Sequence, residues 1–153
     1  MNIWLPETSL AQMRAEASHW SPLETGGILL GYVSESDEIV VTTAIGSGPK
    51  AKRTETRYVH DVEYEIAQAE RLYMKSGKPD LYLGDWHTHP GGRGLMSWLD
   101  RKTLLDIAKS GTALHQPIML ILEEPAWGVC AWRFRRQNLL RLPVIALMEV
   151  HVY

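Results

Sequence analysis

The stretch that most restricts the fold of this chain runs from residue 81 to residue 109 and joins a predicted strand, a glycine-bearing loop and a predicted helix. The strand, Leu81–His87, ends where His87 and His89 stand two positions apart. Side chains at that spacing in a strand point to the same face of a sheet. Gly91–Met96 is the loop and Ser97–Lys109 the helix. Both histidines therefore meet the first turn of the helix only if the loop turns the chain back.

Asp100 lies in that first helical turn, where its carboxylate can reach both imidazoles. Two imidazoles and one carboxylate are a ligand set suited to zinc, and three protein ligands leave one tetrahedral position open for water. An open position is typical of a catalytic site rather than a structural one. The spacing therefore predicts a metal-dependent hydrolase in which His87, His89 and Asp100 hold one Zn2+ per chain.

Such a hydrolase also needs a carboxylate that takes a proton from water and later passes it to the leaving amine. Asp85 shares strand parity with the two histidines, but it is equally well placed to orient a ligating histidine through a hydrogen bond. Glu24 stands at the mouth of the apolar segment Gly26–Val33, beside glycines that permit close backbone approach. Spacing alone leaves the choice between the two carboxylates open.

Ser97 stands three residues before Asp100, at the predicted start of the helix. A serine at this position can cap the helix through its side-chain oxygen. The same hydroxyl, close to a metal, can instead donate a hydrogen bond to the oxyanion of a tetrahedral intermediate. Both roles are compatible, because they use different lone pairs or the proton.

Three motifs give the chain a family resemblance: Glu24-x-x-Gly27-x-Leu29-x-Gly31, Gly84-Asp85-Trp86-His87-Thr88-His89-Pro90 and Ser97-x-x-Asp100. With these motifs the chain resembles the JAMM (MPN+) metalloproteases, and most closely their prokaryotic JAB branch, in which an acidic residue and a tryptophan commonly precede the histidines. The likeness spans roughly residues 21–134, and its His-x-His-Pro…Ser-x-x-Asp pattern is highly specific.

The resemblance implies a role for each motif residue. It implies that His87, His89 and Asp100 bind Zn2+. It also implies that Glu24, rather than Asp85, is the general base and acid. Ser97 would then stabilise the oxyanion.

The same resemblance implies a fold and a substrate. We expect one JAB/MPN metalloprotease domain over residues 1–153, with an α+β (mixed α/β) fold. Its central, curved, mostly antiparallel sheet would be flanked by helices in a cytidine-deaminase-like arrangement. Family members cleave peptide or isopeptide bonds after the C-terminal Gly-Gly of ubiquitin-like proteins and hold that tail in a narrow groove. Adding the tail as an extra strand agrees with known modes of peptide recognition.

The expected partners are a ubiquitin-like protein or its conjugate as substrate, together with E1/E2-like conjugation proteins. Bacterial members often accompany ligase-like conjugation systems, including antiviral ones. Two positions depart from the family. Met96 stands where a proline often precedes the serine, and the short stretch Gly111–Ile118 leaves no room for the second insertion of chain-selective relatives.

Three other functions share part of this pattern. Non-haem Fe(II) oxygenases commonly pair His-x-Asp/Glu with a distant histidine, an order that this chain lacks. A non-catalytic MPN-type binding module would have lost its ligands, whereas this chain keeps them. A peptidase that acts on a small sulfur-carrier protein is a third alternative within the family.

The remaining segments predict a mixed α+β arrangement with helices beside a sheet. Gly46–Arg57 is expected to be a loop. One amphipathic helix is Thr8–His19, with Leu10, Met13 and Ala17 on one side. A second is capped by Asp61, runs to Ser76 and is closed by Gly77, with its apolar side at Val62, Ile66, Ala69 and Tyr73. The predicted strands are Asn2–Leu5, Gly26–Val33, Glu38–Ile45, Pro117–Leu122, Trp127–Phe134 and Leu140–Val150.

The composition further limits the classes of protein to which the chain can belong. The 153 residues fit one domain, and a net charge of -2 argues against bulk binding to nucleic acid or anionic membranes. The apolar stretches are too short to span a bilayer. The single cysteine, Cys130, allows no intrachain disulfide and favours a reducing compartment. The first residues lack the features of a secretory signal peptide, so we predict a cytoplasmic protein.

Several residues receive no catalytic role. Trp86 and Trp98 are expected to be core or wall residues, and Cys130 a small buried apolar residue. The basic residues of the predicted loop form either a solvated surface or a rim that docks an acidic partner: Lys50, Lys52, Arg53 and Arg57. Four histidines have no consistent ligand spacing and are assigned nothing: His19, His60, His115 and His151.

Overall fold

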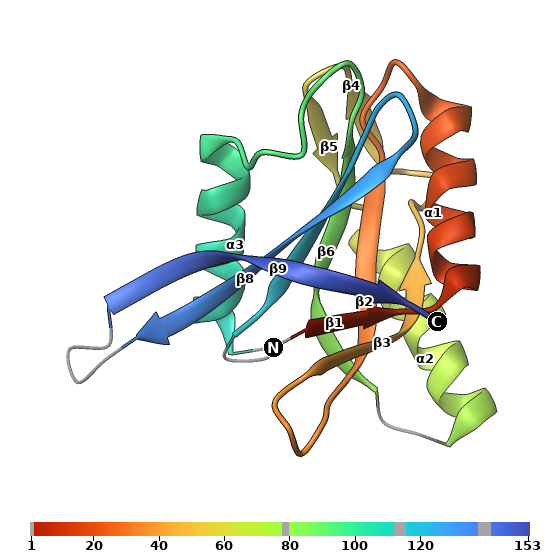
Figure 1. The fold of residues 1–153 in the computed structure, drawn as a ribbon. Helices are drawn as coiled ribbons and strands as arrows, with labels where there is room; N and C mark the ends of the chain where they lie inside the picture. Colours follow the sequence, from red (N-terminus) through yellow and green to blue (C-terminus); the bar gives the residue numbers. More distant parts are fainter. Residues whose placement is uncertain (1, 78–79, 112–115, 138–141) are drawn as a thin grey trace.

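The computed structural model describes residues 2–77, 80–111, 116–137 and 142–153 (Figure 1). Its helices are α1 (Glu7–Trp20), α2 (Val62–Ser76) and α3 (Trp98–Ser110). A two-stranded sheet consists of β4 (Lys52–Thr54) and β5 (Arg57–Val59). The main sheet contains β1 (Asn2–Leu5), β2 (Gly26–Val33), β3 (Ile39–Ile45), β6 (Leu81–His89), β7 (Ile118–Glu123), β8 (Gly128–Gln137) and β9 (Leu142–Val152). The mixed α/β class predicted from the sequence is confirmed.

The main sheet closes into a barrel in the order β1-β3-β2-β6-β7-β8-β9, because β9 also pairs with β1. Antiparallel pairing joins β2 to β3 and β6, and β8 to β7 and β9. Parallel pairing joins β1 to β3 and β9, and β6 to β7. The sheet is therefore curved, as expected, and its curvature is strong enough to close it. Its parallel strand pairs are more numerous than we expected of a mostly antiparallel sheet. Helix α3 lies on one side of this sheet, and α1 and α2 lie on the other (Figure 1).

Most predicted elements agree with the structure to within a few residues at their ends. The clear exception is the predicted loop Gly46–Arg57, which contains β4 and the first residue of β5. That prediction was wrong because strands of three residues are too short, and here too polar, to show a periodic pattern. The prediction of Leu140–Val150 lies partly outside the described residues, which show β9 from Leu142 onward.

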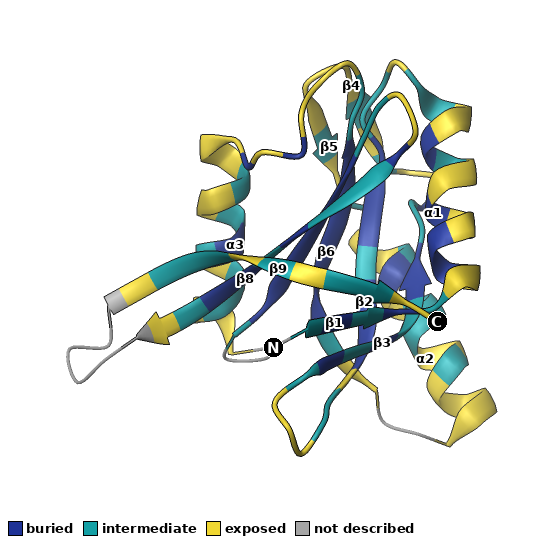
Figure 2. Cartoon of the chain, viewed as in Figure 1, coloured by how far each residue is buried: buried dark blue, intermediate teal, exposed yellow. Residues whose placement is uncertain are grey.

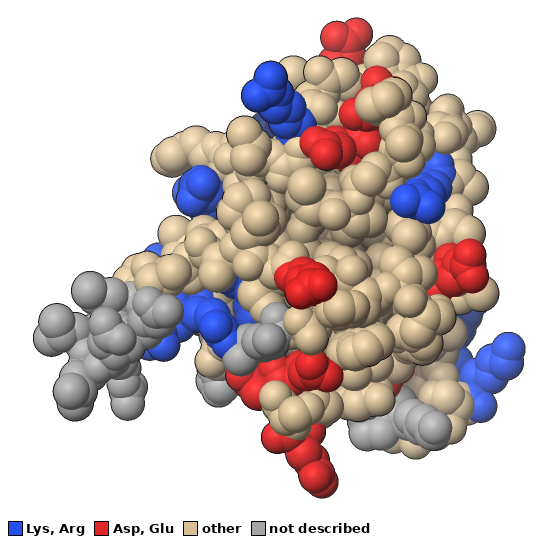
Figure 3. Space-filling view, viewed as in Figure 1, with Lys and Arg blue, Asp and Glu red and all other residues tan. Residues whose placement is uncertain are grey.

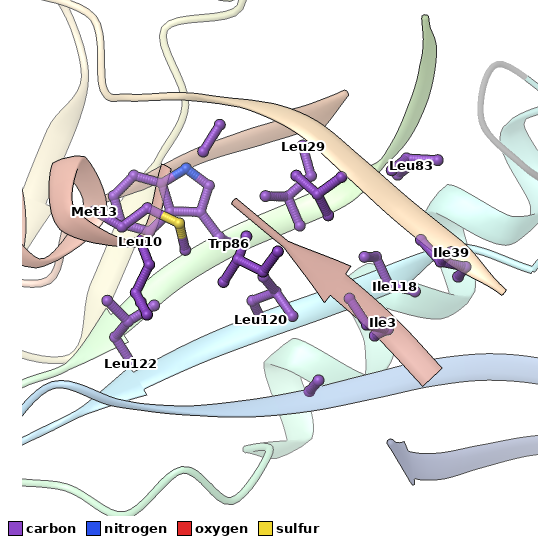
Figure 4. Close-up of a cluster of buried hydrophobic side chains, with 14 of the residues drawn as sticks. Ile3, Leu10, Met13, Leu29, Ile39, Leu83, Trp86, Ile118, Leu120 and Leu122 are labelled. Atoms are coloured by element: carbon purple, nitrogen blue, oxygen red, sulfur yellow. The ribbon is translucent and has the colours of Figure 1, made fainter. Parts of the chain in front are cut away.

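Two clusters of apolar side chains form the core on either side of β7. Ile118, Leu120 and Leu122 belong to the larger cluster, which α1 also enters, as Figure 4 shows around Trp86. Met119 belongs to the smaller cluster beneath α3. Alternate side chains of a strand point to opposite faces, so a strand buried on both faces is apolar throughout. The apolar run of β7 is explained by this double burial.

A β-bulge in β6 decides which side chains face the site. Leu29 pairs with Gly84 while Leu30 pairs with Tyr82, so Leu83 is an extra residue in β6. The bulge changes the alternation, because Leu83 and Trp86 both enter the larger core cluster although their positions differ in parity. Below the bulge, every second side chain from residue 85 to residue 89 points to the opposite, polar face. The bulge therefore places the histidines outside the core.

Helix α1 agrees with its predicted apolar side, since Leu10, Met13 and Ala17 are buried. Helix α2 begins at the predicted cap Asp61 and ends at Gly77 in the left-handed conformation, with φ 64°. Its predicted apolar side, Val62, Ile66, Ala69 and Tyr73, was wrong: the first, second and fourth of these are 59%, 54% and 53% exposed (Figure 2). The buried residue of α2 is Glu65, whose polar contacts inside the protein turn the helix away from the orientation that its apolar residues suggest.

The face of the molecule drawn in Figure 3 does not suggest a surface for a polyanion. Lys and Arg are scattered there among Asp and Glu instead of forming one basic area. Among the described residues, none of the helices combines the length and apolar character needed to cross a membrane.

Candidate active site

The residues singled out by the motifs lie around one pocket of about 390 Å3. One wall is the end of β6 with the loop that follows it, and a second is the start of α3. The turn and second strand of the β4–β5 hairpin form a third wall. Glu24, Asp85, His87, His89, Ser97 and Asp100 all line this pocket. Segments far apart in the sequence are thus brought together at one end of the barrel.

Three side chains converge inside the pocket. The Nε2 atoms of His87 and His89 are 3.0 Å apart, and Asp100 Oδ1 and Oδ2 lie 3.2 Å and 3.4 Å from them, respectively. Ligand atoms held about 2.0–2.1 Å from a tetrahedral zinc ion lie about 3.3–3.4 Å from one another. The donor atoms and their spacing therefore fit a zinc ion, and these three residues can hold a metal.

The loop after β6 fixes the orientation of His89. The Nδ1 atom of its imidazole lies 3.0 Å from the carbonyl oxygen of Arg93. A hydrogen bond from Nδ1–H to that carbonyl would leave Nε2 unprotonated and directed at a metal. The loop itself is held from β7 and the residue after it: Gly94 N–H donates to Glu123, and Gly91 N–H donates to Glu124 over 3.0 Å. These contacts hold the second histidine in place before any metal binds.

Ser97 and Asp100 begin α3 as a reciprocal capping box, which confirms the predicted cap. Ser97 Oγ accepts from the Asp100 N–H over 3.1 Å, and Asp100 Oδ2 accepts from the Ser97 N–H over 2.7 Å. Burial alone would raise the pKa of Asp100, but its hydrogen bonds to His87 and His89 hold that pKa far below the usual range. The carboxylate is therefore ionised and prepared to bind a cation.

Glu24 enters the pocket from the start of β2. Its backbone N–H donates to the carbonyl oxygen of Thr54 over 2.8 Å, which ties it to β4. Close packing of β2 on β6 helps to place it: a Cβ at Gly26 would lie 2.3 Å from the carbonyl oxygen of Trp86. Burial raises the pKa of Glu24, and Asp100 raises it further, against the opposing effect of His87 and His89. A carboxyl group with a raised pKa is suited to accept a proton and release it again.

Asp85, the other candidate base, lines the same pocket but is engaged elsewhere. Its Oδ1 accepts from the Tyr82 hydroxyl, and its Oδ2 lies 3.3 Å from His60 Nε2. No described contact joins it to a ligating histidine, so the suggested orienting role is not seen. His60, for which sequence reasoning predicted no role, lies in the pocket wall. A single histidine before a helix cap is too common a pattern to have identified it.

The structure also places the two tryptophans, Cys130 and the basic segment. Trp86 is fully buried in the core, as expected, whereas Trp98 is 76% exposed, so its prediction as a core or wall residue was wrong. Trp98 is the first residue of α3, where its side chain points into solvent. Cys130 is only partly buried. In the basic segment, Arg53 stacks on the Trp20 ring at 3.8 Å while Lys50 pairs with Glu63 at the surface.

The pocket combines a His-x-His pair at a strand end with an aspartate in the next helical turn and a carboxylate on the opposite wall. These features define a site of the metal-dependent hydrolase class. Comparison with known protein families identifies the family within this class. The chain belongs to the prokaryotic homologs of the JAB domain, whose family model matches residues 6–136. The suspected family is thereby confirmed.

Individual relatives support a JAB-type peptidase. The chain is 42% identical over 122 residues to "Probable metalloprotease y4qB" of Sinorhizobium fredii (strain NBRC 101917 / NGR234), covering 78% of this chain and 74% of that protein. It is 31% identical over 125 residues to a "CD-NTase/cGAS isopeptidase" of Enterobacter hormaechei subsp. hoffmannii (strain UCI 50), covering 78% and 66%. A protein of Escherichia coli (strain TW11681) with the same name is 25% identical over 105 residues, covering 69% and 64%.

The chain therefore spans about two thirds of the length of the two isopeptidases. Among solved structures, it is similar to the solution structure of protein DSY2949 from Desulfitobacterium hafniense. That likeness has a TM-score of 0.68 at 19% identity and covers 99% of this chain and 92% of the other. At this identity the likeness supports the fold alone.

Proposed function

We propose that this protein is a zinc-dependent isopeptidase or endopeptidase that cleaves after the C-terminal Gly-Gly of a ubiquitin-like protein. The observation that carries the proposal is the convergence of His87, His89 and Asp100, at 3.0–3.4 Å, in a pocket that Glu24 also lines. The names of the relatives, a metalloprotease and two isopeptidases, support hydrolysis of an amide bond. The substrate is either a precursor with a C-terminal extension or a conjugate.

In this mechanism His87, His89 and Asp100 would hold Zn2+, which would supply a Lewis acid for the scissile carbonyl and for water. Glu24 takes the proton from the attacking water and delivers it to the leaving amine. Its raised pKa favours the first of these steps. Ser97 donates its hydroxyl proton to the developing oxyanion, while its oxygen continues to cap α3.

The pocket walls suit an extended tail without side chains. β4 and β5 form a two-stranded sheet, and the residues of its turn and of β5 line the pocket. An extended tail that lies along such a strand can pair with it through backbone hydrogen bonds. Two glycines next to the scissile bond would allow this approach without steric conflict.

The proposed setting is a bacterial system that conjugates a ubiquitin-like protein with the aid of E1/E2-like enzymes, including antiviral defence. The two relatives named CD-NTase/cGAS isopeptidase support a conjugated protein as substrate. We place this activity in the cytoplasm, with no nucleic acid or membrane as partner.

The first test compares wild type with Glu24→Gln. We expect about one bound zinc in both proteins, because Glu24 is not among the ligands. Only the wild type should cleave a ubiquitin-like protein that carries a C-terminal extension after Gly-Gly, since Gln cannot transfer the proton. Metal is quantified first, and product is then followed by mass. Equal turnover by the variant would refute the role of Glu24, and failure to bind zinc even after reconstitution would refute the hydrolase.

A further inference from the structure

A second group of ionisable side chains lies in the wall of the pocket, and the proposed mechanism does not use it. His60 stands at its centre, with Nδ1 2.7 Å from Glu65 Oε1 and Nε2 3.3 Å from Asp85 Oδ2. The Tyr82 hydroxyl donates to Asp85, and the Tyr58 ring packs edge-on against His60 at 4.8 Å. We call His60, Glu65 and Asp85 the brace.

The two carboxylates of the brace are buried, and His60, which is 25% exposed, pairs with both of them. The side chains of Glu65 and Asp85 are 5% and 8% exposed. Burial alone would lower the pKa of His60, but the hydrogen bonds to Asp85 and Glu65 raise it to about 10. The imidazole therefore carries a charge, and each of its N–H groups has a carboxylate partner. Because both N–H groups of the imidazole already have partners, the arrangement suits a structural link better than a proton relay.

The brace joins three elements that the main sheet does not join. Glu65 is on α2, Asp85 is on β6 two residues before His87, and His60 directly follows β5. The hairpin β4–β5 belongs to a separate two-stranded sheet, and within the part of the chain that the structure describes no strand of the barrel pairs with β5. Two-stranded hairpins are marginally stable on their own. The position of β5 relative to β6 therefore depends on side-chain contacts.

The other strand of the hairpin is held beside Glu24. Arg53 stacks on Trp20 at 3.8 Å, and its Nε donates to Thr25 Oγ1 over 3.4 Å. The carbonyl oxygen of Thr54 accepts from the Glu24 N–H. β4 is thus tied beside Glu24, and the brace is the set of side-chain contacts that joins the end of β5 to β6.

We propose that Glu65, His60 and Asp85 are positioning residues that fix the β4–β5 hairpin against β6 and thereby set the width of the cleft. This inference rests on the proposed function for the identity of the tail. A narrow cleft contacts the backbone of a glycine tail on both sides and excludes larger residues. The brace is then a determinant of selectivity for glycine beside the scissile bond.

The first experiment needs no substrate. We compare amide hydrogen exchange in wild type, His60→Ala and Glu65→Gln, each loaded with zinc. Exchange of the amides in residues 52–59 should rise by about tenfold or more while exchange in β7 stays unchanged, because only the hairpin loses its support. Glu65→Gln is included because it removes one charge while conserving volume, in case His60→Ala folds poorly. Unchanged exchange in the hairpin of either folded variant would overturn the proposal.

The second experiment measures selectivity with two fluorogenic peptides. They differ only in the two residues before the scissile bond, which are Gly-Gly in one peptide and Ala-Gly in the other. For both variants, KM for the Gly-Gly peptide should rise about tenfold with kcat within about threefold, since binding and not chemistry is weakened. The preference for Gly-Gly over Ala-Gly should fall. A merely structural role would lower the amount of folded enzyme without changing this preference.

His151→Ala is the matched control, because His151 lies on β9, outside the pocket, and stacks on Trp4. It should change neither hairpin exchange nor selectivity. A loss of kcat at constant KM in the brace variants would overturn the positioning role and assign the network to the chemistry. A wild type that cleaves neither peptide contradicts the Gly-Gly substrate, and hydrogen exchange alone then decides whether the brace holds the hairpin.

Discussion

Ser97 contributes to the start of α3 through both its side-chain oxygen and its backbone N–H. Its Oγ accepts from the Asp100 N–H, while its own N–H donates to the Asp100 carboxylate. The hydroxyl proton is not required for either bond. Since Ser97 lines the pocket beside the histidines, we propose that this proton is donated to the oxyanion during catalysis. In this proposal one residue both caps α3 and offers a hydrogen-bond donor to the reaction.

Replacing Ser97 by Ala tests both functions at once. Turnover should fall by roughly 10^2–10^3, as for loss of other oxyanion donors. The free energy of unfolding should fall by about 1 kcal/mol because the cap is lost. Ser97→Thr keeps the oxygen and the proton and serves as the control, with most of the activity retained. Steady-state kinetics and thermal melts check the two effects, and full activity in Ser97→Ala would leave Ser97 as a cap alone.

The β-bulge in the strand β6 separates the side chains that enter the core from those that face the pocket. Gly84 adopts φ 143°, a conformation that favours glycine. A Cβ at this position would lie 1.9 Å from the carbonyl oxygen of Ile118 on β7. Glycine therefore allows both the bulge and the close approach of β7, and the bulge in turn directs His87 toward the pocket.

Gly84→Ala should consequently damage the site and the fold together. We expect a loss of more than about 2 kcal/mol in the free energy of unfolding, from backbone strain and the contact with β7. Zinc affinity should fall by about tenfold or more, because the ligand-bearing strand moves. Gly77→Ala is a matched control, since Gly77 has φ 64° but a Cβ at that position would meet no atom within 4 Å. In Gly77→Ala, denaturation should show a loss of stability from backbone strain, while zinc titration should show an unchanged affinity. A zinc affinity of Gly84→Ala equal to that of wild type would contradict the role of the bulge.

Some features of these strands and helices could be predicted from the sequence, and others could not. The pairing of His87 with His89 and the cap at Ser97 depend on local periodicity, and the structure has both at the expected places. The bulge at Gly84 depends on register with β2, which no local pattern contains. Likewise, the inward turn of Glu65 is set by its contact with His60, so hydrophobic periodicity predicted the wrong side of α2.

At the scale of the whole molecule, a bound metal would connect two elements that are separated by a loop. His87 and His89 come from β6, whereas Asp100 comes from α3, and Glu123 and Glu124 hold the intervening loop. A ligand that binds only the folded state adds its binding free energy to the stability of the whole protein. Metal loading should therefore stabilise the barrel and α3 as one unit.

This coupling predicts a metal-dependent melting temperature. At a free zinc concentration of about 100 times Kd, the added stability is about 2.7 kcal/mol. For a protein of this size that corresponds to a rise of roughly 5–11 °C in Tm, at about 2–4 °C per kcal/mol. The rise should shrink below neutral pH, because protons compete for the histidines and the hydrogen bond to Asp100 raises the pKa of His89 against the effect of burial. A chelator should reverse it, and Asp100→Asn should abolish most of it, as measured by thermal melts with and without zinc. An equal rise in Asp100→Asn would place the metal elsewhere and remove the basis for the proposed hydrolase.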